Sequence, residues 1–126
     1  LEGVGKVVAG GPMMGRAVSN IDAPVTKGTS GVLLIPTAES LRQKPDTCIR
    51  CAKCVEACPM GLEPYLLNTL TQRHDFEELE NHWIADCIEC GCCTYSCPSY
   101  LPLLDWVRIG KAEVMKRIRE RAMAKK

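Results

Sequence analysis

The sequence has few aromatic residues and no long hydrophobic run. Its 126 residues include one Phe, two Trp and three Tyr. The longest purely apolar run, Val32–Ile35, has four residues, whereas a membrane-spanning helix needs about twenty. We therefore expect a modest apolar core and no transmembrane segment. Small domains with so little core often depend on bound metals or other cross-links for stability.

The sequence also lacks an excess of one charge. The formal net charge is +1, although residues 74–90 are acidic and residues 106–126 are mostly basic. These two runs have two interpretations, solvated helix faces or docking surfaces. The basic run lacks interleaved aromatic residues, so we expect no nucleic-acid partner. No nucleophile or acid–base pair is evident, so we predict no catalytic residues.

Cysteine is abundant by contrast, with nine residues. The pattern C-x2-C-x2-C-x3-C-P begins at Cys48 and again at Cys87, 39 positions later. Thiolates at steps of three can reach three irons of one cubane, and the fourth iron needs a ligand from elsewhere. The repeated motif therefore predicts two [4Fe–4S] clusters as cofactors.

In two-cluster ferredoxins the fourth Cys of each run ligates the other cluster. This rule divides the eight predicted iron ligands into two sets. The first cluster is assigned to Cys48, Cys51, Cys54 and Cys97, and the second cluster to Cys87, Cys90, Cys93 and Cys58.

Other roles for the cysteines are weaker alternatives. Zinc needs only pairs of C-x2-C, and it does not require three evenly spaced thiols with a fourth before proline. Disulfides are disfavoured by the odd count and by the absence of a signal peptide. Cys92 aligns with Lys53 when the copies are superposed, so we interpret it as a small residue beside the second cluster, or alternatively as a reserve ligand.

Residues 1–40 resemble the end of a larger domain. Val4, Val7 and Val8 predict a strand that ends at a glycine-rich turn, and a second strand is expected over 31–35. Two strands cannot bury a face alone, so we expect truncation here. Residues 41–126 are expected to form the cluster domain.

The cluster domain is predicted to be helical. Pro64–Arg73 and about Phe76–His82 have helical patterns, the second with Asp75 as its cap. A long helix should follow Pro102. The predicted fold class is mainly α: an all-helical two-[4Fe–4S] ferredoxin-like domain preceded by a short β-containing segment.

Charges near the two motifs differ. Arg50 and Lys53 lie within the first motif, whereas Glu89 and Cys92 occupy the matching positions of the second. Because nearby positive charge stabilises an added electron, we predict the higher potential for the first cluster.

Several motifs together resemble a known family. They are Gly10-Gly11-Pro12-Met13-Met14-Gly15, the segment 24–31, and the two cysteine runs with Pro59-Met60-Gly61-Leu62 and Pro98-Ser99. This combination is similar to the C-terminal part of the C subunit of the bacterial Rnf electron transport complex, an ion-translocating ferredoxin:NAD oxidoreductase. The two glycine-containing motifs make the resemblance specific, since many ferredoxin-like proteins share the cysteine pattern.

The resemblance implies a one-electron relay within a membrane-associated complex. It implies a peripheral position on the cytoplasmic side of the bacterial membrane, with other members of the complex as partners and ferredoxin as a candidate partner. FMN and NADH would bind only upstream, and residues 1–40 would end a β-grasp-like domain. Catalysis would belong to the complex, of which this segment is the electron-transfer portion.

Two alternative functions stay open at this point. One is the iron–sulfur subunit of another oxidoreductase, linked to quinone or heterodisulfide. The other is an interaction module in which metal only stabilises the fold.

Overall fold

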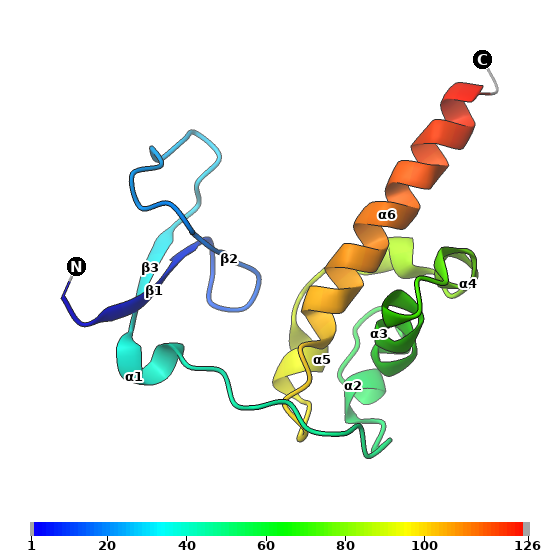
Figure 1. Cartoon of the computed structure of the whole chain (residues 1–126), viewed down its shortest axis with the longest axis horizontal. Coiled ribbons are helices and arrows are strands. Elements are labelled where there is room, and N and C mark those ends of the chain that lie inside the picture. The colour runs from blue at the N-terminus through cyan, green and yellow to red at the C-terminus, as the bar shows by residue number, and fades with distance from the viewer. Residues whose placement is uncertain (1, 125–126) are drawn as a thin grey trace. The chain divides into compact units, whose positions relative to one another are not determined.

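The structure, a computed structural model, describes residues 2–124 and contains two compact units. The first unit lies within residues 1–44 and the second within residues 45–126 (Figure 1). The domain boundary predicted at residue 40 stays a prediction.

The first unit is a small antiparallel sheet. Its strands are β1 (Val4–Ala9), β2 (Arg16–Ala17) and β3 (Val32–Pro36), in the order β2-β1-β3. The short helix α1 (Thr37–Ser40) follows β3 directly. Among the described residues of this unit, only Val8 is a buried hydrophobic residue. The sheet therefore contributes very little apolar core.

The glycine-rich stretch forms the turn that its composition predicts. Gly10 has φ of +107°, a conformation that costs glycine little. Its amide donates to the carbonyl of Gly31 at 2.8 Å, and the amide of Gly15 donates to the carbonyl of Gly11 at 2.8 Å. These bonds join the turn to the chain that leads into β3.

The predicted fold class is wrong. The chain is 42% helical and 11% strand and contains a three-stranded sheet, so it is not mainly α. The sequence pattern indicated β1 and β3 but not β2. Both residues of β2 are exposed, and two residues are too few to show an alternating pattern.

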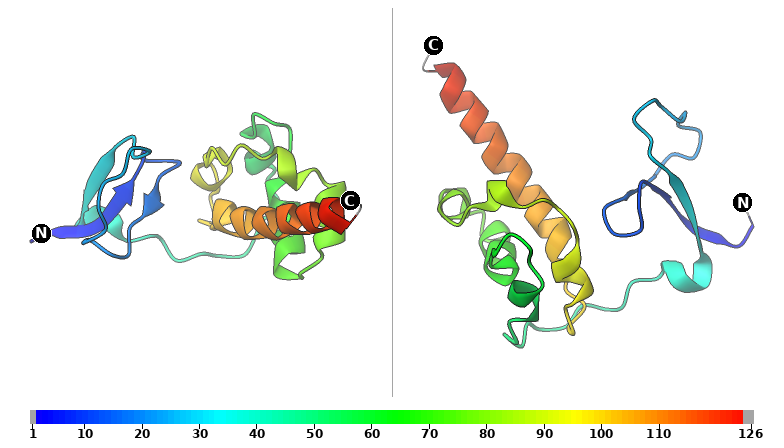
Figure 2. Two further views of the ribbon diagram at one scale, coloured as in Figure 1. Left: turned by 90° about the horizontal axis from the view of Figure 1, so that it is seen from above. Right: turned by 180° about the vertical axis from the view of Figure 1, so that it is seen from behind.

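The second unit contains short and long helices connected by loops (Figure 2). They are α2 (Lys53–Glu56), α3 (Pro64–Gln72), α4 (Phe76–Asn81), the 3₁₀ turn η1 (Ile84–Asp86), α5 (Cys92–Tyr95) and α6 (Leu103–Ala124). The helices predicted over 64–73 and 76–82 are confirmed to within one residue, and so is the long helix after Pro102.

Local chemistry explains where α3 and α4 begin. Pro64 occupies the first turn of α3, where a missing amide hydrogen costs no helical bond. The Asp75 carboxylate accepts a hydrogen bond from the Glu78 amide at 3.3 Å, which confirms the predicted cap of α4. Acidic residues in the first turn add a favourable interaction with the helix dipole.

The core of the second unit lies where α6 packs against α3, α4 and η1. The most fully buried side chains include Leu67, Leu79, Ile84, Val107 and Val114. Each contributes about 1.5–3 kcal/mol by leaving water. Beyond this core the last turns of α6 extend past the other helices of the unit (Figure 1).

Gly110 permits the close crossing of α6 over α3. A methyl group at this position would overlap the Thr71 hydroxyl and would lie 3.0 Å from Ile84 Cδ1 and 3.1 Å from Leu79 Cδ1. Gly110 follows Thr71 by 39 residues, which is the spacing of the cysteine repeat. The two helices therefore meet at equivalent positions of the two copies.

We expect Gly110→Ala to destabilise the second unit by about 1–3 kcal/mol, because the packed core cannot absorb the added methyl group. The measurement is thermal unfolding of the iron-loaded chain under anaerobic conditions. Adding Thr71→Ala should recover part of the loss, and Gly28→Ala, whose new methyl group meets no atom within 4 Å, is the control. A melting temperature raised by Gly110→Ala would show that helix propensity outweighs the contact.

Candidate iron–sulfur site

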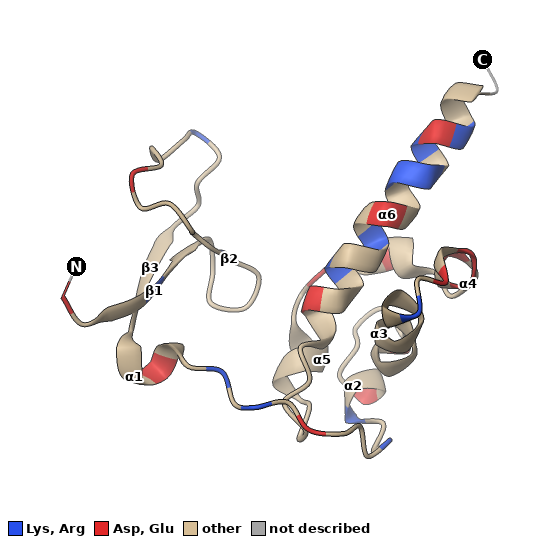
Figure 3. Cartoon of the chain, in the orientation of Figure 1, with Lys and Arg blue, Asp and Glu red and all other residues tan. Residues whose placement is uncertain are grey.

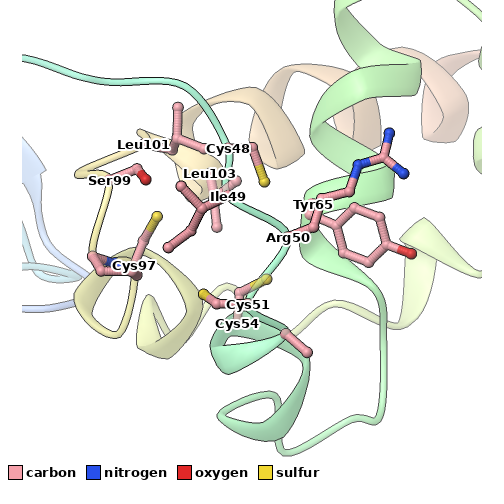
Figure 4. Close-up of a pocket in the computed structure, with 12 residues that line it drawn as sticks. Cys48, Ile49, Arg50, Cys51, Cys54, Tyr65, Cys97, Ser99, Leu101 and Leu103 are labelled. Atoms are coloured by element: carbon pink, nitrogen blue, oxygen red, sulfur yellow. The ribbon is translucent and has the colours of Figure 1, made fainter.

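The first predicted set of thiols surrounds one cavity. This cavity has a volume of about 150 Å³, and its wall includes Cys48, Cys51, Cys54 and Cys97. Figure 4 shows these four side chains around a common space. Three come from the first cysteine run, and Cys97 comes from the second. Cys48 and Cys51 are exposed, whereas Cys54 is buried.

The second predicted set lines a separate and smaller cavity, of about 20 Å³. Its thiols are Cys58, Cys87, Cys90 and Cys93. Again one thiol, here Cys58, comes from the other run. Leucine and valine side chains of the core, Leu67, Leu104 and Val107 among them, form part of this wall.

The loops that carry the thiols have repeated backbone conformations. Arg50 and Ala52 have positive φ of 52° and 62°, and Glu89 and Gly91, 39 residues later, have φ of 57° and 85°. A non-glycine residue in this region costs about 1–2 kcal/mol. The surrounding structure must offset that cost, and such strain is characteristic of functional loops.

The short helices after these loops also repeat. The amides of Cys58 and Cys97 donate to the carbonyls of Val55 and Thr94 at 3.0 and 3.3 Å, so equivalent bonds position the fourth thiol of each run. The chain then turns at the proline that follows each fourth cysteine, as the sequence predicts. Two loops with different side chains thus present their thiols in the same way.

Burial makes several thiols hard to ionise. It raises the pKa of the Cys93 thiol to about 11, and it also raises the pKa of Cys54 and of Cys87. These groups are therefore protonated thiols at neutral pH. A bound cation would favour the thiolate form, so metal binding at these cavities must displace protons.

Two cations of α6 lie beside the second set, and no local pattern in the sequence indicated them. The Lys111 ammonium donates to the Cys87 carbonyl at 2.6 Å and lies 4.0 Å from the Glu89 carboxylate. The Arg108 Nε donates to Glu89 at 2.9 Å. Glu89 is therefore compensated, and its surroundings carry a net positive charge. The higher potential for the first cluster stays a prediction, but one of the charges on which it depended is neutralised.

Cys92 lines neither cavity. Its thiol is within hydrogen-bond contact of the Cys90 thiol. This position agrees with the interpretation of Cys92 as a residue beside the second site.

Within residues 2–124, no three Cys, His, Asp or Glu side chains converge closely enough to hold a single metal ion. In a cubane each thiolate binds a different iron, so the four sulfur atoms lie farther apart than around one ion. This finding therefore concerns a mononuclear zinc site rather than a cluster.

Comparison with known proteins places the site in a class. Residues 40–98 match the 4Fe-4S dicluster domain family. Within this class, the chain belongs to the C subunits of ion-translocating oxidoreductase complexes, the Rnf type, which confirms the resemblance inferred from the sequence.

Three relatives, each the C subunit of such a complex, illustrate this similarity. The chain is 33% identical over 118 residues to that of the ion-translocating oxidoreductase complex of Buchnera aphidicola, covering 91% of this chain and 24% of that protein. It is 40% identical over 116 residues to that of the Na(+)-translocating ferredoxin:NAD(+) oxidoreductase complex of Acetobacterium woodii, covering 92% and 26%. It is 42% identical over 78 residues to the proton-translocating counterpart of Clostridium ljungdahlii, covering 62% and 17%.

The chain thus spans about a quarter or less of the length of these curated relatives. No helix within the described residues is long and apolar enough to cross a membrane.

Proposed function

We propose that the two thiol sets hold two [4Fe–4S] clusters with crossed ligation. The first cluster would be held by Cys48, Cys51, Cys54 and Cys97, and the second by Cys87, Cys90, Cys93 and Cys58. One observation carries this proposal: each cavity is lined by three thiols of one run and the fourth thiol of the other. The support comes from the donor sets and the loop geometry, not from the cavity volumes.

The function that this arrangement supports best is a one-electron relay. A [4Fe–4S] cluster accepts and releases single electrons, which is the chemistry the bound groups would supply. The chain contributes the thiols, the apolar wall formed by Leu67, Leu104 and Val107, and the charges of Glu89, Arg108 and Lys111.

Crossed ligation also gives the clusters a structural role. Loss of either cluster would leave buried thiols from both runs without a metal, and the apolar core of the unit is small. We therefore infer that iron binding and folding of residues 45–126 are coupled.

We further propose that the relay operates within a membrane-associated, ion-translocating ferredoxin:NAD oxidoreductase complex. The support is the names of the Acetobacterium and Clostridium relatives. In this proposal the segment lies peripherally on the cytoplasmic side, contacts other members of the complex, and follows an upstream region that binds FMN and NADH. The same names disfavour a quinone- or heterodisulfide-linked enzyme.

Crossed ligation can be tested in a chain that holds one cluster. Replacing Cys48, Cys51 and Cys54 by serine should reduce the iron content from about eight to about four per chain, since each cubane contains four irons. In that background, Cys58→Ser should abolish the remaining cluster, whereas Cys97→Ser should retain it. Iron and sulfide analysis with EPR of the dithionite-reduced protein provides the measurement. The opposite result for the two variants would show that each run ligates its own cluster.

The charges around the second set generate another prediction. Lys111→Met removes a cation but keeps a side chain of similar length, so the second cluster should shift to a more negative potential. The measurement is an EPR-monitored redox titration, with unchanged iron content as a requirement. Lys116→Met, an exposed position of α6, is the matched control. Equal shifts in both variants would indicate a net-charge effect without a specific contribution from Lys111.

A further inference from the structure

A cationic groove lies beside the first thiol set. It has a volume of about 400 Å³, and Cys48 forms part of its wall as well as part of the wall of the first cavity. Arg50 and Arg73 line the groove, together with Tyr65 and Leu101. Figure 4 shows Arg50 and Tyr65 extending to one side, away from the thiols.

The charges in this groove are not compensated by the part of the chain that the structure describes. No acidic side chain there lines the groove, and neither Arg50 nor Arg73 belongs to an ion pair among the described residues. A carboxylate outside the wall, that of Glu63, accepts a hydrogen bond from the Tyr65 hydroxyl at 3.3 Å. Two exposed guanidinium groups without an acidic partner favour an anionic occupant.

The cations of α6 differ in this respect. Arg121 contacts Glu80 at 2.5 Å, Arg117 pairs with Glu113 at 3.3 Å and lies over the Phe76 ring, and Arg108 pairs with Glu89 (Figure 3). These side chains are engaged within the unit. The arginines of the groove are therefore better candidates for binding a partner than these members of the basic run.

The rim of the groove has the composition of a protein interface. Ile49, between Cys48 and Arg50, is 67% exposed, and Tyr100, next to Leu101, is 57% exposed. Arginine together with exposed large apolar and aromatic residues is enriched in protein interfaces. A small anion would not need this apolar rim.

We propose that this groove docks an acidic segment of a protein electron carrier, so that electrons enter or leave the chain at the first cluster. The proposal rests on the relay function proposed above. Cys48 connects the groove to the first thiol set, and the second set has no such exposed position, since its four thiols are all partly buried. Electrostatic attraction would orient the carrier over Cys48 and speed its association.

The test uses the iron-loaded 126-residue chain, with the double variant Arg50→Glu, Arg73→Glu. Glutamate suits position 50, because Glu89 occupies the equivalent position with φ of 57°. The control variant, Lys116→Glu with Arg119→Glu, makes the same change in net charge on exposed positions of α6. Iron and sulfide content and the reduction potentials are measured first for all three proteins.

Stopped-flow electron transfer is then measured with an acidic bacterial ferredoxin and with basic cytochrome c. We expect the groove variant to slow transfer with ferredoxin about tenfold or more at low salt, to weaken its salt dependence, and not to slow transfer with cytochrome c. The α6 variant should have a much smaller effect. A change in driving force alone would alter the rates with both carriers, so the contrast between carriers isolates docking.

Three outcomes would overturn the proposal. They are an unchanged rate in the groove variant, an equal loss in the α6 variant, and inhibition of both carriers by millimolar pyrophosphate at constant ionic strength, which would make the groove a small-anion site. Failure of the relay function is distinguishable from these. In that case the iron-loaded wild-type chain itself would exchange electrons with neither carrier.

Discussion

The arrangement of the second unit depends on the exchange of one cysteine between two loops. Each cavity has three thiols from its own run and one from the other, so neither thiol set is complete unless both runs are in register. The helices that follow the two loops, α3 and α6, begin 39 residues apart and pack on each other. Their crossing at Thr71 and Gly110 fixes the distance between the loops. A core of few leucine, isoleucine and valine residues can then suffice, because the thiol sets connect the same elements a second time.

Backbone strain is distributed unequally over the two copies. Three positions of each copy have positive φ, and in two of the three pairs one member is a glycine: Ala52 pairs with Gly91, and Gly61 with Tyr100. Ala52 and Tyr100 therefore carry a side chain in a conformation that their counterparts adopt at little cost. The conformation is repeated although the residue type is not, which indicates that the tertiary arrangement of the loops imposes it. Metal binding is the interaction that can offset such strain, since it acts directly on the residues between the thiols.

Local patterns in the sequence were sufficient for much of this structure. Helical periodicity and capping located α3 and α4 to within one residue, and Asp75 was identified as a cap because its effect depends only on residues three positions away. The cysteine repeat grouped the thiols as the structure groups them. What the sequence could not supply depends on residues far apart in the chain. Strand β2 exists only because it pairs with β1, and its two residues have no pattern of their own. Gly110 looked like a weak point in a helix until Thr71 was found against it, and Lys111 reaches Cys87 across 24 residues.

The same separation explains why charge near a motif is a poor guide to charge near a site. The sequence suggested a cationic first loop and an acidic second loop, because Arg50 and Lys53 are matched by Glu89 and Cys92. In three dimensions Glu89 is held by Arg108 and Lys111, whose positive charges face the second thiol set from α6. Arg50, by contrast, extends away from the first thiol set toward a groove that no described acidic side chain lines. Cations are thus present at both sites but differ in their surroundings. Those of the second site are partly buried and paired, so they act mainly on the buried thiols, whereas those of the first site are exposed to solvent, where their field is screened over short range and is felt chiefly by a molecule in direct contact.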